Sequence, residues 1–276
     1  MGSDRADQVV LTTGANSGIG LAATVEVARQ GFHSIGSVRS AAKAKVVHAA
    51  AREAGVEVET VLLDVADADA CEDVMAGLTL YGLVNNAGYS NLGAIEDVSD
   101  DAARRQLETM LIAPMRLCRL ALPAMRAAGG GRIVNVSSIF GRTTIPLAGW
   151  YQAAKHGLEG ASDALRQEVA ADGIHVALVE PGGVRTGLWA EVEAEVEGLT
   201  GSRYETGYRR QLDVTRRTNP LMGDPAHCAR IIATALTTRL PRARYLVGAD
   251  AQALALVERL TPTSVKDRVT RLVLGL

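Results

Sequence analysis

Short apolar runs rich in Val, Ile and Leu alternate along the chain with longer stretches whose apolar residues recur at helical spacing. We expect strands at residues 8–13, 33–38, 57–63, 82–85, 132–137, 175–179 and 244–247. Helices are predicted at residues 19–30, 41–54, 68–80, 101–128, 150–171 and 225–238. This alternation is typical of a parallel sheet that helices cover on both faces. The pattern therefore predicts an α/β fold, with residues 1–276 in one doubly wound domain around a seven-stranded parallel sheet.

Two segments interrupt the alternation. Residues 187–220 contain several glycines and no strand pattern. Because ligands of open α/β sheets bind beyond the carboxyl ends of the strands, we expect a substrate-binding lid there. Residues 250–276 are predicted to form a C-terminal helical extension, since apolar residues recur at helical spacing from Val265 to Leu276. We interpret this extension as a cover for the body or for a partner subunit, and peripheral membrane contact is the alternative.

Composition and charge exclude several classes of protein. An apolar fraction of 47% excludes a wholly disordered chain, and a net charge of −2 with 4% aromatic residues argues against a nucleic-acid partner. The three cysteines, Cys71, Cys118 and Cys228, have neither metal-ligand nor disulfide spacing. Neither a secretion signal nor an apolar run of about 18 residues is present. We therefore expect a reduced, metal-free, cytoplasmic protein with no integral membrane segment.

A glycine-rich turn joins the first predicted strand to the first predicted helix. Its spacing is G-x-x-x-G-x-G, and we predict that it binds a pyrophosphate through Gly14, Asn16, Ser17, Gly18, Ile19 and Gly20. Glycines permit the tight turn and the close approach of backbone, and free N–H groups at the helix start attract an anion. A methyltransferase fold would show a similar turn. The lack of a following Gly-Lys-Ser/Thr argues against a P-loop nucleotidase.

The end of the second predicted strand bears on which dinucleotide binds. An NAD site expects an acidic residue there to bond the ribose hydroxyl, but residues 36–40 contain none and include Arg39 and Ser40. A guanidinium suits a 2′-phosphate through charge-assisted hydrogen bonds. We therefore expect NADP(H) to be preferred, with NAD(H) possible. The alternative is that Arg39 only begins a solvent-exposed helix.

Tyr151 and Lys155 lie four residues apart on a predicted helix, so their side chains share one face. A nearby ammonium favours the phenolate, which would make Tyr151 usable as a proton donor or acceptor near neutral pH. The strand upstream ends in Ser137 and Ser138, at the sheet edge where a dinucleotide should lie.

Together these motifs resemble those of the short-chain dehydrogenase/reductase family, in its shorter single-domain branch with a Rossmann fold. The matching pieces are Thr13 to Gly20, Asp64 in Leu63-Asp64-Val65, Asn85-Asn86-Ala87-Gly88, Asn135-Val136-Ser137-Ser138, Tyr151-Gln152-Ala153-Ala154-Lys155, and Pro181-Gly182 with Thr186. They occur in the family's order across most of the chain, from about residue 8 to residue 250.

The resemblance implies a role for each matching residue. Tyr151 would be the general acid/base, Lys155 would hold the nicotinamide ribose and lower the pKa of the tyrosine, and Ser138 would polarise the substrate oxygen. The remaining cofactor contacts would come from Asp64, Val65, Asn86, Ala87, Gly88, Pro181, Gly182, Val184 and Thr186. The implied activity is hydride transfer between NADP(H) and the carbon of an alcohol, ketone or aldehyde.

One residue departs from the family pattern. The family usually has an Asn in the helix after the fourth strand, where it supports a water chain that returns the proton to the Tyr–Lys pair, and this chain has Met110 there. A thioether does not donate a hydrogen bond, so only the backbone carbonyl of Met110 is left to hold that water. This departure motivates an alternative function, a catalytically weak NADP(H)-binding sensor or regulatory protein.

The substrate is indicated only by analogy. The segment after residue 244 is similar to that of reductases resembling the retinol and steroid dehydrogenases, which implies a bulky apolar alcohol or ketone. Relatives also suggest a homodimer or homotetramer. We expect an apolar substrate wall formed by Tyr89, Phe140, Trp150, Trp189 and Tyr204.

Overall fold

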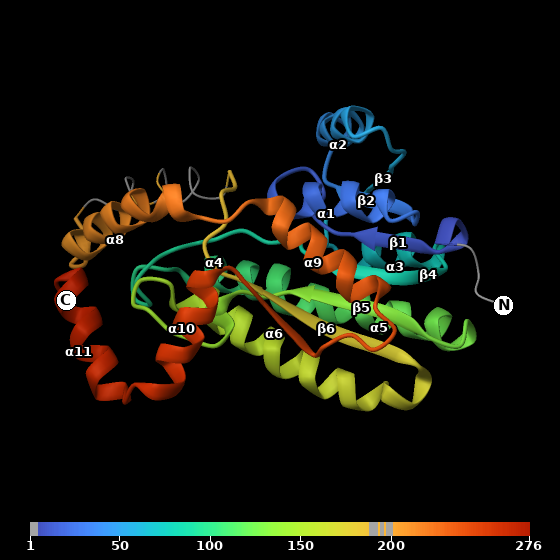
Figure 1. Ribbon diagram of the computed structural model, residues 1–276. Helices are drawn as coiled ribbons and strands as arrows, with labels where there is room; N and C mark the ends of the chain where they lie inside the picture. The colour runs from blue at the N-terminus through green and yellow to red at the C-terminus, as the bar shows by residue number, and fades with distance from the viewer. Residues whose placement is uncertain (1–4, 188–192, 194–195, 197–200) are drawn as a thin grey trace.

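The computed structural model describes residues 5–187, 193, 196 and 201–276. Its centre is a seven-stranded parallel sheet, as predicted, and the strands have the order β3-β2-β1-β4-β5-β6-β7 (Figure 1). The strands are β1 (Val9–Thr12), β2 (His33–Val38), β3 (Glu59–Leu62), β4 (Leu80–Asn85), β5 (Gly131–Val136), β6 (Ile174–Pro181) and β7 (Arg244–Val247). The order reverses at β1, which pairs with both β2 and β4. In open α/β sheets a ligand binds beyond the carboxyl ends of the strands at such a reversal.

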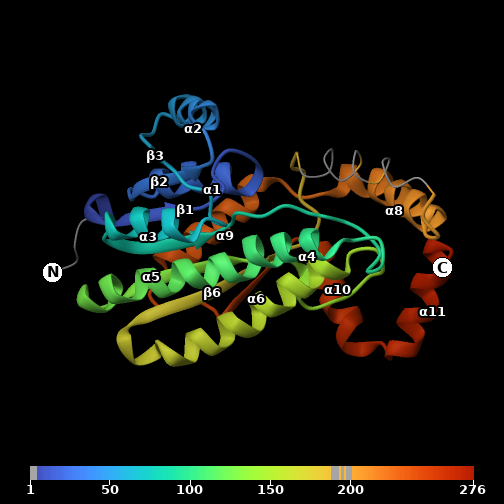
Figure 2. The same ribbon diagram turned by 180° about the vertical axis from the view of Figure 1, so that it is seen from behind.

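Helices cover both faces of the sheet (Figure 2). The main ones are α1 (Gly18–Arg29), α2 (Ala41–Glu53), α3 (Ala68–Ala76), α4 (Asp100–Leu107), α5 (Ala113–Ala127), α6 (Gly149–Glu168), α8 (Glu205–Thr218), α9 (Pro225–Thr237), α10 (Ala249–Leu260) and α11 (Thr263–Leu274). Helix α1 packs beside α9, and α3 packs beside α5. The predicted two-sided cover is therefore confirmed.

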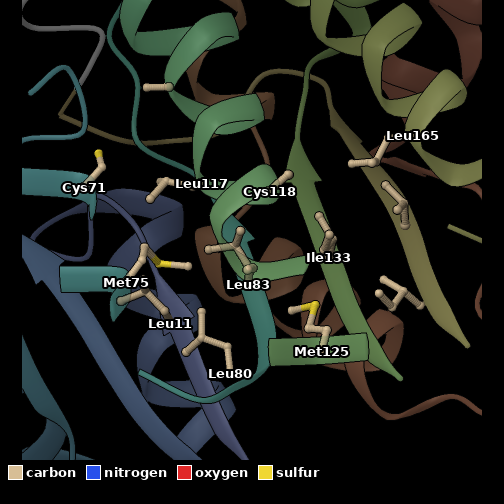
Figure 3. Close-up of a cluster of buried hydrophobic side chains, with 14 of the residues drawn as sticks. Leu11, Cys71, Met75, Leu80, Leu83, Leu117, Cys118, Met125, Ile133 and Leu165 are labelled. Carbon is tan, nitrogen blue, oxygen red and sulfur yellow. The ribbon is translucent and has the colours of Figure 1, made fainter. Parts of the chain in front are cut away.

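Neighbouring residues of the central strands enter two different cores. Leu11, Leu83 and Ile133 pack with residues of α3 and α5 in the cluster shown in Figure 3. Val10 and Val84, each next to one of these leucines, pack instead with residues of α1 and α9. Side chains of a strand alternate between its two faces, so a strand covered on both sides is apolar at consecutive positions.

The helix predicted at residues 101–128 is divided in the structure. Between α4 and α5 the chain forms a π-helical turn at Glu108–Ile112, in which the N–H of Ala113 donates to the carbonyl of Glu108. Pro114 follows immediately, and it has no N–H to donate to the carbonyl of Met110 four residues earlier. The wider turn is the local response to this missing donor.

Most predicted boundaries agree with the structure to within one or two residues. The exceptions include the helix predicted at residues 68–80, because α3 ends at Ala76 and Leu80 already begins β4. Leu80 is fully buried and pairs with Val9 of β1, so it belongs to the strand and not to the helix. Tertiary pairing overrides local helix propensity here.

The C-terminal extension forms two helices, α10 and α11, which lie beyond one edge of the sheet (Figure 1). Helix α11 packs against α8, and Leu274 is buried there. Val265, Val269, Leu272 and Val273 are exposed. Among the described residues, no helix is long and apolar enough to cross a membrane.

Candidate active site

The glycine-rich turn lies between β1 and α1 and is packed against the end of β4. Gly14 has φ of +67°, and a Cβ on it would stand 2.9 Å from Cα of Ala87. A Cβ on Gly20 would stand 2.2 Å from the carbonyl oxygen of Gly14. Both positions therefore require glycine, for close backbone approach and, at Gly14, also for its positive φ.

Thr13 ties this turn to the segment after β4. Its hydroxyl oxygen accepts hydrogen bonds from the N–H groups of Asn86 and Ala87, both at 2.9 Å. The side chain of Asn86 donates in return to the carbonyl of Thr13 at 2.9 Å. These bonds bring together two segments that the sequence assigned to the cofactor from separate motifs.

A third segment reaches the same place from the end of β6. A Cβ on Gly18, whose φ is +52°, would stand 2.9 Å from Cγ2 of Thr186. Asp250, in the first turn of α10, accepts a hydrogen bond from the N–H of Gly183 at 2.6 Å and so holds this loop. The sequence analysis missed Asp250, although an acidic residue just after Gly248 at a helix start is a recognisable signal.

An open cleft of about 540 Å³ lies beside these segments. Its lining includes Gly18, Arg185, Thr186 and Asn219. A larger cavity of about 710 Å³ lies at the opposite edge of the sheet, where its lining includes His33 and Glu59 at the first residues of β2 and β3. We place the candidate site at the former cleft, because ligands of such sheets bind at the carboxyl ends of the strands.

Four further predicted cofactor residues follow β2 and β3. Arg39 is exposed directly after Val38, the last residue of β2, and Ser40 caps α2 by accepting from the N–H of Lys43 at 3.4 Å. Asp64 is exposed and accepts from the N–H of Ala66 at 3.0 Å, whereas Val65 is buried in the core. The guanidinium of Arg39 has no ion pair with the described part of the chain and is available to an anion.

The structure brings Ser138 and Tyr151 together. Ser138 follows β5, and its hydroxyl accepts from the N–H of Phe140 at 3.2 Å. Burial raises the pKa of Tyr151, and a hydrogen bond with the Ser138 side chain opposes this rise. From the sequence, a neighbouring ammonium was expected to lower this pKa. In the structure the burial of the phenol is the larger effect, because desolvation disfavours the phenolate.

Lys155 lies one turn further along α6. Its Nζ donates to the carbonyl of Val136 at 2.8 Å and stands 6.0 Å from the centre of the Tyr151 ring. Burial lowers the pKa of Lys155 to about 8, and the carboxylate of Glu159 opposes this effect. The ammonium is thus anchored on β5 while its remaining N–H donors stay available.

The predicted substrate residues are only partly gathered around Tyr151. The ring of Phe140 meets that of Tyr151 edge-on, with 6.5 Å between the centroids. Trp150 precedes Tyr151 on α6, and its buried Nε1 has no hydrogen-bond partner in the part of the chain that is described. Tyr204 packs instead in a separate cluster with Tyr208, which the sequence analysis did not single out. Tyr89 follows Gly88 and is partly buried, and Trp189 lies outside the described residues.

Met110 is 2% exposed, in the π-helical turn between α4 and α5. Its methyl carbon would stand 3.5 Å from a Cβ on Gly88, so the thioether packs against the cofactor segment after β4. The sequence singled out this position only through a family pattern.

Comparisons with known proteins agree with this geometry. A family model described as short chain dehydrogenase matches residues 8–197. An uncharacterized oxidoreductase of Bacillus subtilis, YusZ, is 33% identical over 96% of this chain and 97% of its own. Human retinol dehydrogenase 5 is 31% identical over 96% of this chain and 88% of its own. A crystal structure of an actinorhodin polyketide ketoreductase variant with NADPH superposes with a TM-score of 0.78, at 29% identity over 92% of this chain and 99% of that one.

Proposed function

The chain belongs to the short-chain dehydrogenase/reductase family and is an NAD(P)-dependent oxidoreductase, and from this premise we propose that it reduces a bulky apolar ketone or aldehyde with NADPH, or oxidises the corresponding alcohol. The observation that carries the proposal is the hydrogen bond between Ser138 and Tyr151 together with the anchoring of Lys155 on the carbonyl of Val136, at the end of β5. A protein that only senses the cofactor has no physical need for all three groups.

The dinucleotide supplies or accepts a hydride when bound. Its pyrophosphate would lie on the backbone N–H groups from Gly14 to Gly20, where the glycines let the chain approach closely. Asp64, Val65 and Asn86 to Gly88 would border the adenosine half. Lys155 and the loop from Pro181 to Thr186 would hold the nicotinamide half. Three close approaches that exclude a Cβ, at Gly14, Gly18 and Gly20, support this fit.

Arg39 would decide in favour of NADP(H). Its exposed guanidinium follows the last residue of β2, where a charge-assisted hydrogen bond to a 2′-phosphate is possible. We expect Arg39→Ala to raise the KM for NADPH about tenfold and to leave that for NADH nearly unchanged. Lys45→Ala, which removes a cation from the following helix α2, is the control. Equal losses for the two cofactors, or equal effects of the two variants, would refute the assignment.

The proton would move at the oxygen of Tyr151. In carbonyl reduction, Ser138 and Tyr151 donate hydrogen bonds to the substrate oxygen, and the Tyr151 hydroxyl releases its proton to that oxygen as negative charge develops there. The charged Lys155 nearby stabilises the phenolate that remains. In alcohol oxidation the same groups act in reverse.

The preference for an apolar substrate rests on the aromatic residues and on the relatives. Phe140 contacts Tyr151 edge-on, Trp150 precedes Tyr151 on α6, and Tyr89 follows the segment after β4. Retinol dehydrogenases are among the similar proteins. We propose that the oligomer is a homodimer or homotetramer.

The test is NADPH oxidation over a panel of apolar and polar carbonyl compounds, with product identification. We expect turnover of bulky apolar ketones or aldehydes, reduced at least 100-fold in Tyr151→Phe. Tyr81→Phe is the matched control, because the Tyr81 hydroxyl donates to the carbonyl of Leu236, far from the site. Equal rates in the wild type and Tyr151→Phe would remove the enzyme proposal and favour the sensor.

A further inference from the structure

A cluster of charged side chains follows Lys155 along α6 and continues onto β6 and β7. Glu159 stands four residues after Lys155 on α6, so the two side chains share one face of the helix. Each is 6% exposed. One carboxylate oxygen of Glu159 accepts from Nε of Arg244 at 3.0 Å, and the other, Oε1, is buried with no hydrogen-bond partner in the described chain.

Gly141 leaves room for that unpaired oxygen because it has no side chain. A Cβ on Gly141 would stand 2.9 Å from Cγ and 3.2 Å from Oε1 of Glu159. The same Cβ would stand 2.7 Å from the hydroxyl oxygen of Ser137, which is itself buried without a partner in the described residues. The local backbone therefore admits the carboxylate of Glu159 next to the strand end that carries Ser138.

Two arginines and two further carboxylates complete the cluster. Arg244 binds Asp163 at 2.6 and 3.1 Å, and its Nε stands 3.1 Å from Oε1 of Glu180. Glu180, on β6, is fully buried and also accepts from Arg142 at 3.3 Å. Burial and the neighbouring Glu159 raise the pKa of Glu180 to about 7, although both arginines oppose this effect.

A buried ammonium is costly unless a carboxylate compensates its charge. The charged groups of the cluster come from α6 (Lys155, Glu159, Asp163 and its partner Arg166), β6 (Glu180), β7 (Arg244) and the chain after Gly141 (Arg142). Arg244 is shared among three carboxylates, whereas Glu159 is the acid that acts on Lys155. Oε1 of Glu159 accepts no hydrogen bond from an arginine in the described chain.

We propose that Glu159 is a positioning residue for the reaction: it lies one turn further along α6 and is held by Arg244, and its carboxylate favours the charged form of Lys155 behind Tyr151. This inference rests on the proposed function, in which the charged lysine stabilises the phenolate. Ser138, Tyr151 and Lys155 would contact the substrate and cofactor, and Glu159 would act on them only through Lys155.

The test measures the protonation of Lys155 directly. The chain has only four lysines, Lys43, Lys45, Lys155 and Lys266, so NMR of protein isotopically labelled at lysine Cε gives few signals, and Lys155→Arg identifies the one required. We expect Lys155 to titrate near pH 8 in the wild type and about one unit lower in Glu159→Gln, because removing a nearby negative charge disfavours the ammonium. At pH 7.5 the charged fraction then falls about threefold.

Asp163→Asn is the matched control. It also removes a carboxylate partner of Arg244, but Asp163 stands two turns from Lys155 and does not act on its pKa. We expect it to leave the titration of Lys155 in place even where its melting temperature falls as much as that of Glu159→Gln. Glu159→Asp, which keeps the charge and withdraws it by one methylene, should give a smaller shift and serves if Glu159→Gln does not fold.

The pH dependence of the rate gives a second readout. The rate of carbonyl reduction should decline at high pH as Lys155 loses its proton. The pH of this decline should be about one unit lower in Glu159→Gln and unchanged in Asp163→Asn. An unchanged Lys155 titration in Glu159→Gln, or an equal shift in Asp163→Asn, would overturn the inference. A shifted titration in a protein that turns over no carbonyl compound would support the role of Glu159 and count against the proposed function alone.

Discussion

At the scale of single residues, the candidate site depends on a few buried polar groups whose state is set by their surroundings. Burial raises the pKa of Tyr151 and lowers that of Lys155, so each group is pushed toward its neutral form. Ser138 opposes the first shift and Glu159 the second. The residue types were readable from the sequence, but the balance between burial and partners was not.

Met110 is the residue whose effect on turnover is easiest to isolate. We expect Met110→Asn to have an equal or higher kcat, because its carboxamide donates and accepts hydrogen bonds where the thioether cannot donate. The smaller side chain leaves space next to Gly88, so stability should fall by about 1–2 kcal/mol. Steady-state kinetics and thermal melts measure both effects.

Met110→Leu is the control for Met110→Asn, since it preserves apolar volume and adds no hydrogen-bonding group. Its kcat should match that of the wild type. A large loss of activity in Met110→Asn, with a melting temperature that shows it folded, would contradict the idea that a side-chain role is missing at this position.

At the scale of elements, the site is made by four connections that end at one edge of the sheet. The glycine-rich turn, the segment after β4, the segment after β5 and the loop after β6 come from distant parts of the sequence. Hydrogen bonds of Thr13 and Asp250 lock two of them into position. A break in the α4–α5 helix before Pro114 places Met110 beside Gly88.

Helix α11 offers a test of how the C-terminal extension is held. Leu274 is 7% exposed against α8, whereas Leu272 in the same helix is 71% exposed. We expect Leu274→Ala to lower the free energy of unfolding by about 2 kcal/mol and Leu272→Ala to change it by less than about 0.5 kcal/mol. Chemical denaturation of both variants measures the difference. Equal effects would mean that α11 does not pack on α8 in this way.

At the scale of the whole molecule, the sheet carries one candidate site and an appended pair of helices. The two cores lie on opposite faces of the sheet, and the residues assigned to cofactor and catalysis gather at its carboxyl edge. The segment expected to act as a lid includes α8. Tyr208 of α8 and the preceding Tyr204 pack in one hydrophobic cluster with Leu147. Helix α11 packs on α8, and α10 contacts β7, so the extension is connected both to the segment expected to act as a lid and to the sheet.

The sequence by itself determined the sheet, the glycine-rich turn and the Tyr–Lys pair. Each of these depends on residues close together in the chain: apolar periodicity, glycine spacing, or two side chains four apart on a helix. The order of the strands, β3-β2-β1-β4-β5-β6-β7, came from the structure, because the pairing of strands depends on contacts between segments far apart in the chain.

Only the tertiary structure decided which charges stand behind Lys155. The charges come from three elements: Glu159 from α6, Glu180 from β6 and Arg244 from β7. In the sequence, nothing near any one of them distinguishes it from a charged residue on the surface. Packing buries their carboxylates and guanidinium together, where removal from water makes their interactions strong enough to shift a pKa. Local pattern carries no information about such contacts, because burial and distance between remote residues exist only once the chain has folded.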